Sequence, residues 1–124
     1  MPALNRVQLI GNLGKDPEMR TSPSGKPVTT FSVAVNQHWR GSDGGARETT
    51  DWFNVEAWGR LAEICKEYLH KGSLVFVEGR LKTDRYEHQG ETRYFTKVIA
   101  VRMQMLDRPV PEEPAPEGEE PEGE

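Results

Sequence analysis

Apolar and polar residues alternate with a period of two along several stretches of the chain, which is the pattern of a β-strand with one face in a core. Residues 28–36 show it most clearly, because Phe31, Val33 and Val35 fall on one face of the strand. Four other apolar stretches, bounded by turn residues, are residues 4–13, 50–58, 73–81 and 92–106. The pattern therefore predicts five strands, with a hairpin at residues 88–90 between the last two.

One stretch has the period of an α-helix. Between Arg60 and Lys71 the apolar residues recur three and four positions apart and form a single stripe. They are Leu61, Ile64, Cys65, Tyr68 and Leu69. Gly72 stands where a glycine would cap the C-terminal end of this helix.

The order of these elements favours one fold class. A single helix between strands 3 and 4 of an otherwise all-β domain of about a hundred residues is typical of the OB fold. We therefore predict an all-β protein, a five-stranded OB-fold barrel with one α-helix between strands 3 and 4. A β-sandwich is the alternative, because a strand count alone does not determine topology.

The charges divide the chain into two parts. Residues 1–106 hold 15 lysines and arginines against 12 acidic residues, a net charge of +3, whereas residues 107–124 hold one arginine against eight acidic residues. The second part consists mostly of Pro, Glu and Gly, and it cannot bury enough apolar surface to offset the entropy cost of ordering. We predict one domain over residues 1–106 and a disordered acidic tail over residues 107–124, an asymmetry that suggests a basic nucleic-acid surface.

The composition disfavours a secreted or membrane protein. The chain has one cysteine, opens without the apolar run of a secretory signal, and contains no run of the roughly 18 apolar residues that span a bilayer. The expectation is a soluble cytoplasmic protein without disulfides or a membrane partner.

The sequence also lacks the signatures of an enzyme. His38, His70, His88 and Cys65 do not have the close spacing of metal ligands. Residues 11–15 lack the Walker spacing of a phosphate-binding loop. We predict no catalytic residues, no metal and no cofactor.

Residues 51–58 carry the most informative pattern. Strand alternation divides them into a core face and an outward face. The core face consists of Phe53, Val55 and Ala57, and the outward face of Trp52, Asn54, Glu56 and Trp58. Two exposed indoles on one strand predict a platform on which bases stack without sequence preference. The alternative is that a loop or a partner subunit covers the indoles, or that one of them closes an end of the barrel.

Two further aromatic residues could extend this platform. Trp39 stands beside Arg40 at a glycine-rich loop, and Tyr86 stands beside Arg85 in the last hairpin. An aromatic residue beside a cation can take a base and its phosphate together. Other candidate phosphate contacts are Arg6, Arg47, Arg60, Lys71 and Lys82.

Several segments in the same order resemble the bacterial single-stranded DNA-binding protein family, over nearly all of residues 4–106. They are Asn5-Arg6-Val7, Ile10-Gly11-Asn12-Leu13-Gly14, Asp16-Pro17-Glu18, Trp58-Gly59-Arg60-Leu61-Ala62-Glu63, Tyr68-Leu69, Lys71-Gly72-Ser73, Val77-Glu78-Gly79 and Met103-Gln104-Met105-Leu106. So much ordered agreement is far more specific than a single short motif.

The resemblance implies an OB fold, a homotetramer, and single-stranded DNA wrapped around it during replication, recombination and repair in the bacterial nucleoid. Carried over by position, the stacking aromatics of the family fall on Trp39, Trp52, Trp58 and Tyr86. Its basic contacts fall on Arg6, Arg60, Lys71, Lys82 and Arg85, and less closely on Arg40 and Arg47. At Trp58 and Tyr86 other members carry a different aromatic residue, which leaves the stacking argument intact.

The end of the chain departs from this family. Its members usually close on an acidic tip ending in Pro-Phe, which replication and repair proteins grasp, whereas this chain closes on Pro121-Glu122-Gly123-Glu124. Replication and repair proteins are candidate partners by this resemblance, but the apolar anchor of their usual route of recruitment is missing from this sequence. The rival interpretation of the whole chain is an OB module that binds a protein or a structured RNA.

Overall fold

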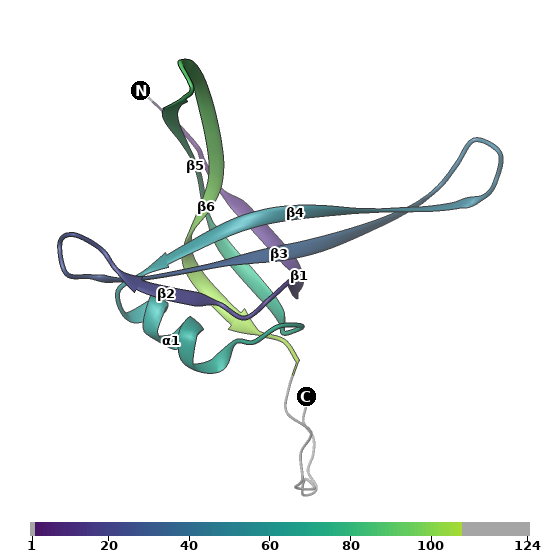
Figure 1. Cartoon of the computed structure of the whole chain (residues 1–124). Helices are drawn as coiled ribbons and strands as arrows, with labels where there is room; N and C mark the ends of the chain where they lie inside the picture. The colour runs from purple at the N-terminus through teal and green to yellow at the C-terminus, as the bar shows by residue number, and fades with distance from the viewer. Residues whose placement is uncertain (1, 108–124) are drawn as a thin grey trace, which may run out of the picture.

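The computed structural model describes residues 2–107, so the predicted tail lies, apart from its first residue, outside the described residues. The elements along the chain are β1 (Val7–Leu13), β2 (Glu18–Thr21), β3 (Pro27–Arg40), β4 (Ala46–Trp58), α1 (Arg60–Tyr68), β5 (Leu74–His88) and β6 (Glu91–Met105). Figure 1 shows a twisted barrel with the helix below it and two long hairpins that leave it.

Five of the strands close into a barrel. They hydrogen-bond in the order β1-β5-β6-β4-β3, and β3 returns to pair with β1. Only β4 and β6 run parallel, with Val55 opposite Val98, and the other pairs are antiparallel. The predicted barrel is confirmed, and the sandwich alternative is wrong. The short β2 (Glu18–Thr21) pairs with β3, and the sequence pattern did not predict it because its four residues are exposed and show no apolar alternation.

The barrel is filled by the residues that alternation predicted to face inward. Phe31, Val33, Val55 and Ala57 are buried in one apolar cluster that extends over all five barrel strands. Val35 is only half-buried, because β3 is leaving the barrel at that point. The core thus consists mainly of valines and small residues that fit a narrow barrel.

The helix α1 closes one end of the barrel. Ala62 and Cys65 are buried, and the hydroxyl of Thr29 on β3 donates a hydrogen bond to the carbonyl oxygen of Ala62 at 2.7 Å. Burial raises the pKa of the Cys65 thiol to about 11. The predicted stripe was wrong at Tyr68, which is exposed.

The predicted end of the helix was also wrong. The helix ends at Tyr68, and its cap, Leu69, has an extended backbone. Gly72, with φ of +91°, belongs to the turn that follows, in which the amide of Ser73 donates to the carbonyl oxygen of His70. The side chain of Leu69 is buried in the core cluster, and its backbone is extended. The helix therefore ends before Gly72.

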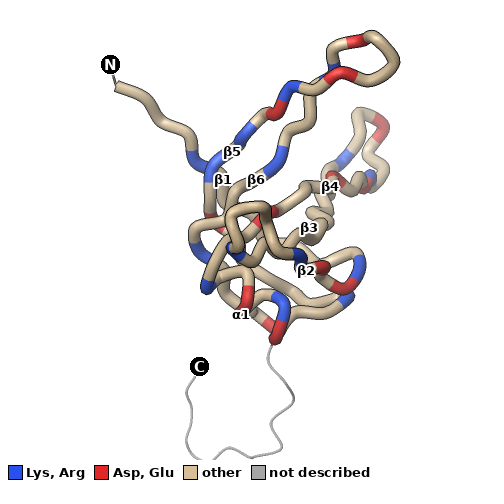
Figure 2. Tube along the Cα trace, turned by 60° about the vertical axis from the view of Figure 1, so that its left-hand side comes forward, with Lys and Arg blue, Asp and Glu red and all other residues tan. Residues whose placement is uncertain are grey.

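Two hairpins extend beyond the barrel, and we call residues 36–50 the first arm and residues 82–97 the second arm. The prediction ended β3, β4 and β5 near the barrel because the apolar alternation stops there, whereas the predicted strand at residues 92–106 already included most of the β6 half of the second arm. The predicted hairpin at residues 88–90 is confirmed, with Gln89 and Gly90 both in the left-handed region that suits a two-residue turn. Figure 2 shows basic residues near the base of the second arm and acidic residues toward its tip.

Candidate nucleic-acid interface

The two indoles of β4 lie at the surface. Trp52 is 59% exposed and Trp58 is 40% exposed, while Val55 and Ala57 between them are buried. The strand therefore divides into two faces as its alternation predicts. Within the described residues, no loop covers either indole.

The indole of Trp52 rests on a glycine. A Cβ atom placed on Gly14 would lie 2.5 Å from Cζ3 and 2.9 Å from Cη2 of Trp52, so an alanine there would collide with the ring. The missing side chain lets the six-membered part of the indole settle on the backbone after β1. This contact holds the ring in place and leaves the rest of it open to solvent.

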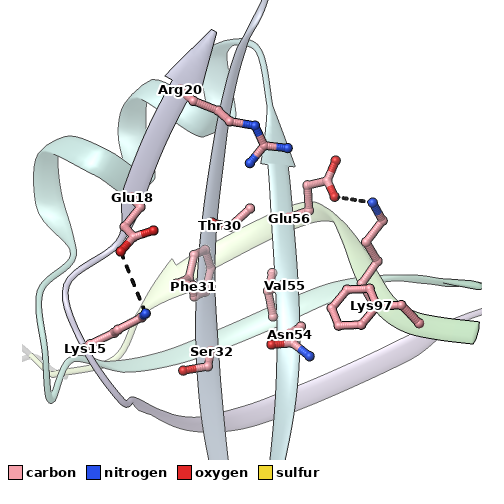
Figure 3. Close-up of a pocket in the computed structure, with 11 residues that line it drawn as sticks. Lys15, Glu18, Arg20, Thr30, Phe31, Ser32, Asn54, Val55, Glu56 and Lys97 are labelled. Carbon is pink, nitrogen blue, oxygen red and sulfur yellow. Dashed lines mark ion pairs between the residues drawn. The ribbon is translucent and has the colours of Figure 1, made fainter. Parts of the chain in front are cut away.

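Glu56 was predicted to lie on the outer face of β4 and to be exposed there. The direction is right, but the exposure is wrong. The side chain is on the outer face of β4, but the residue is only 5% exposed. The indole nitrogen of Trp58 donates to Oε2 of Glu56 at 2.6 Å, and Nζ of Lys97 lies 2.6 Å from Oε1. Figure 3 shows Lys97 reaching from β6 to this carboxylate.

The charges continue from Lys97 along β5. Lys97 also pairs with Asp84 at 3.0 Å, and Asp84 pairs with Lys82 at 3.0 Å. Burial lowers the pKa of Lys97, but hydrogen bonds to Glu56 and Asp84 outweigh it and leave that pKa above its ordinary value. Hydrogen bonds from Lys82 and Lys97 hold the pKa of Asp84 below its ordinary value. Both shifts favour the charged forms of Lys97 and Asp84.

Lys97 stands where three hollows of the barrel surface meet, and we call them together the outer groove. Their volumes are about 320, 610 and 340 Å³. Trp52 lines the third hollow and Trp58 the second. The cations that line the groove are Lys15, Arg20, Arg80, Lys82 and Lys97. Figure 3 shows the side chain of Arg20 extending from β2 over β3 toward β4.

Of the predicted phosphate contacts, Lys82 lines this groove. Arg6 lies elsewhere, paired with Glu78 on the outer side of β1 and β5. Lys71 is in the turn after α1, where its backbone amide donates to Asp16.

The other predicted cations lie at the edges of the groove or on the arms. Arg60 begins α1 directly after β4 and forms an exposed pair with Glu63 at 3.4 Å. In the first arm, Arg47 pairs with Asp43 at 3.1 Å, and Arg40 donates to the carbonyl oxygen of Gly44.

Strand register corrects the predicted partners of Tyr86 and Trp39. Neighbours in a strand point to opposite faces, so Arg85 cannot share a face with Tyr86. The residue opposite Tyr86 is Arg93, and the residue opposite Arg85 is Tyr94. Trp39 likewise stands opposite Arg47, not beside Arg40 in space.

The four aromatic residues are not all on one surface. Tyr86 lies on the same face of the second arm as Lys82 and Lys97, so that face continues the outer groove. Ala34 on β3 stands opposite Trp52 and shares its face of the β3–β4 ladder. Trp39 is five positions after Ala34, so by strand alternation its side chain leaves from the other face. Both Trp39 and Tyr86 are exposed.

Sequence reasoning missed several residues that the fold brings to these surfaces. They are Lys15, Arg20, Arg80, Lys97, Arg93, Tyr94 and Phe95. For the second arm a signal was present, since a two-residue turn at Gln89 and Gly90 determines which residues stand opposite each other. For Arg20 no signal was present, because β2 has no apolar alternation.

Residues 2–107 contain no candidate metal site and no candidate membrane-spanning helix. No group of three or more His, Cys, Asp or Glu side chains in this part of the chain could hold a metal ion. No helix in the same residues is long and apolar enough to cross a membrane.

The closed barrel with its capping helix, and a surface groove lined by indoles and cations, define an OB-barrel protein. The model of the Single-strand binding protein family matches residues 4–106. The chain belongs to that family.

Individual relatives agree with this. The chain is 44% identical over 105 residues to Single-stranded DNA-binding protein 1 of Chlorobaculum tepidum, a match that covers 83% of this chain and 65% of that protein. The chain thus spans just under two thirds of the length of this relative.

Two solved structures share the fold. One is a Plasmodium falciparum SSB in complex with ssDNA, with a TM-score of 0.81 and 28% identity, covering 86% of this chain and 98% of the other. The second is a deletion mutant of the single-stranded DNA binding protein from Thermus aquaticus, with a TM-score of 0.76 and 36% identity, covering 84% and 51%.

Proposed function

We propose that this chain binds single-stranded DNA without sequence preference and protects it during replication, recombination and repair. The observation that carries this proposal is the placement of Trp52 and Trp58, two exposed indoles on one rigid strand beside a basic groove. Membership of the single-strand binding family and the relatives above support it.

Stacking supplies the tolerance for sequence. Every base has a π-face, and each base stacked on an aromatic side chain contributes about 1 to 3 kcal/mol. Trp58 and Trp52 would take bases in the groove, Tyr86 would extend the path along the second arm, and Trp39 would take a strand that passes around the first arm.

The phosphates would lie on the groove cations. Arg20 and Arg80 have no ion pair within residues 2–107, so their charges are available to a strand. Lys82 is shared with Asp84. The remaining predicted contacts would be reached only by a strand that continues past the groove. They are Arg6, Arg40, Arg47, Arg60, Lys71 and Arg85.

Titration with oligo-dT tests the proposal. We expect strong quenching of the tryptophan fluorescence, and an affinity that falls with salt at a logarithmic slope of about −0.7 per phosphate neutralised. A duplex and a structured RNA hairpin of equal length serve as competitors. Equal or tighter binding of either competitor, without quenching, would support the rival OB module and contradict the proposal.

We also propose that the chain acts as a homo-oligomer, a tetramer by its family resemblance. Ile10 on β1 is exposed and stands opposite Phe76 on β5, and Arg102 lies over the Phe76 ring at 5.7 Å. Beyond the pairing at its last two residues, the outer edge of β1 has no strand beside it in the described part of the chain. An apolar face next to an open strand edge suits a symmetric contact between two copies. Sedimentation of the purified chain measures the assembly directly.

A further inference from the structure

The carboxylate of Glu56 occupies an unexpected place, buried at the centre of a groove proposed to take a polyanion. Burial of a carboxylate is unfavourable unless each oxygen finds a donor. Here each oxygen has one at 2.6 Å, the indole nitrogen of Trp58 on Oε2 and the ammonium of Lys97 on Oε1. The carboxylate therefore joins an aromatic residue and a cation that come from different strands.

The geometry of β4 explains why the indole is held. Glu56 and Trp58 are two residues apart, so their side chains leave the same face of the strand as neighbours. For its nitrogen to reach Glu56, the indole must turn its N–H edge toward that residue. The ring nevertheless stays 40% exposed. One edge is thus tied down while ring surface remains open to a base.

The same carboxylate holds Lys97. The parallel pairing of β4 with β6 brings Val98 beside Val55, and this places Lys97 within reach of Glu56. The side chain of Lys97 is only 18% exposed and is held from its other side by Asp84 on β5. A flexible lysine is thereby fixed at the meeting point of the three hollows.

We propose that Glu56 is a positioning residue, which holds the Trp58 indole and the Lys97 ammonium in their binding arrangement before DNA arrives. This inference rests on the proposed function and names the residue that prepares its groove. Side chains already ordered in the free protein lose less freedom on binding, so preorganisation strengthens binding without a contact from Glu56 to the DNA.

If Glu56 positions Trp58 and Lys97, its removal should weaken DNA binding, whereas electrostatics alone predicts that its removal strengthens binding. Glu56 is a negative charge in a groove for phosphates, and its loss would strengthen the attraction if charge were its only effect. Within the network the two anions, Glu56 and Asp84, already offset Lys82 and Lys97. The sign of the change in affinity therefore separates positioning from simple repulsion.

The experiment compares Glu56→Gln and Glu56→Leu in the full chain, with Glu67→Leu as the control on an exposed residue of α1. Glutamine keeps an oxygen that can accept the indole N–H, whereas leucine leaves that N–H without its acceptor and leaves Lys97 paired with Asp84 alone. We expect the affinity for oligo-dT to fall about tenfold in the leucine variant and to stay within about threefold in the glutamine and control variants. Glu56→Met is the substitute if the leucine variant does not fold, as judged by circular dichroism.

A second readout follows the indole without DNA. In a Trp39→Phe/Trp52→Phe background Trp58 is the remaining tryptophan, so its indole N–H gives one assignable NMR signal. We expect exchange of this proton with water to be slow with Glu or Gln at position 56 and at least tenfold faster with Leu.

The outcomes are distinct. Unchanged exchange, or a gain of affinity in both variants, overturns the positioning role. Failure of the unsubstituted chain to bind oligo-dT overturns the proposed function, while the exchange measurement decides the positioning of Trp58 independently.

Discussion

At the scale of single residues, the groove depends on what lies beneath its aromatic rings. Trp52 is seated on a glycine and Trp58 is tied to a buried carboxylate. Both indoles are therefore ordered although they are exposed, and order at the surface is what a stacking platform requires. Neither support could be recognised from the sequence, because Gly14 and Trp52 are far apart in the chain and Glu56 was expected to be solvated.

The seat of Trp52 yields a prediction. In Gly14→Ala the new methyl group would collide with the indole, and we expect the ring to be displaced. Binding of oligo-dT should weaken by up to the value of one stacked base, about 1 to 3 kcal/mol. Fluorescence titration measures the affinity, and thermal unfolding checks the fold.

A double substitution provides the control. In a Trp52→Ala background the same glycine change should have no further effect on affinity, because the two changes act on one contact. An additive loss in the double variant would show that Gly14 acts by another route.

At the scale of elements, the second arm carries two different faces. Tyr86, Phe95 and Arg93 share one face with the groove lysines, and Arg85 and Tyr94 share the other. The residue next to an aromatic in sequence is thus not its partner in space. The turn at Gln89 and Gly90 sets this register.

The register predicts unequal effects of two arginines. We expect Arg93→Gln to lower the affinity for oligo-dT several-fold and to reduce the salt slope by about 0.7, the value for one lost phosphate contact. Arg85→Gln, the matched variant on the opposite face, should change both quantities less. Binding titrations at several salt concentrations measure them. A larger effect of Arg85 would place the strand on the Tyr94 face instead.

At the scale of the whole molecule, barrel closure creates both the groove and the surface opposite to it. The groove lies over β2, β3, β4, β5 and β6, while Ile10 and Phe76 lie on the outer side of β1 and β5. A contact between copies through β1 would leave the groove open, which is consistent with an oligomer that binds DNA.

This separation predicts that assembly and binding respond to different changes. Ile10→Asp places a charge on the apolar face, and we expect the sedimenting mass to fall to a smaller species. Met19→Asp, an exposed apolar residue on β2, is the control and should leave the mass unchanged. An Ile10→Asp variant with the mass of the unsubstituted chain would contradict an interface at this face.

Much of the fold could be predicted because it follows from local pattern. Alternation in residues 28–36 and 50–58 determined which side chains face the core, and the spacing of apolar residues determined one helix. The first arm, the β5 half of the second arm and β2 could not be predicted in the same way, because these segments have no apolar alternation. The predicted strand at residues 92–106 already covered the β6 half of the second arm. Helix length was missed because burial of Leu69 outweighed the glycine signal at Gly72.

The sequence by itself determined the closed barrel's strand pattern, the outward direction of the two β4 indoles and the membership of a family. Each of these depends on residues that are close together in the chain or on their order. The tertiary structure alone decided that Glu56 is buried, that Lys97 meets it and that Arg20 reaches the groove. These facts depend on which strands become neighbours, and the parallel pairing of β4 with β6 joins residues about forty positions apart. No local period records such a meeting, because it arises only when the barrel closes.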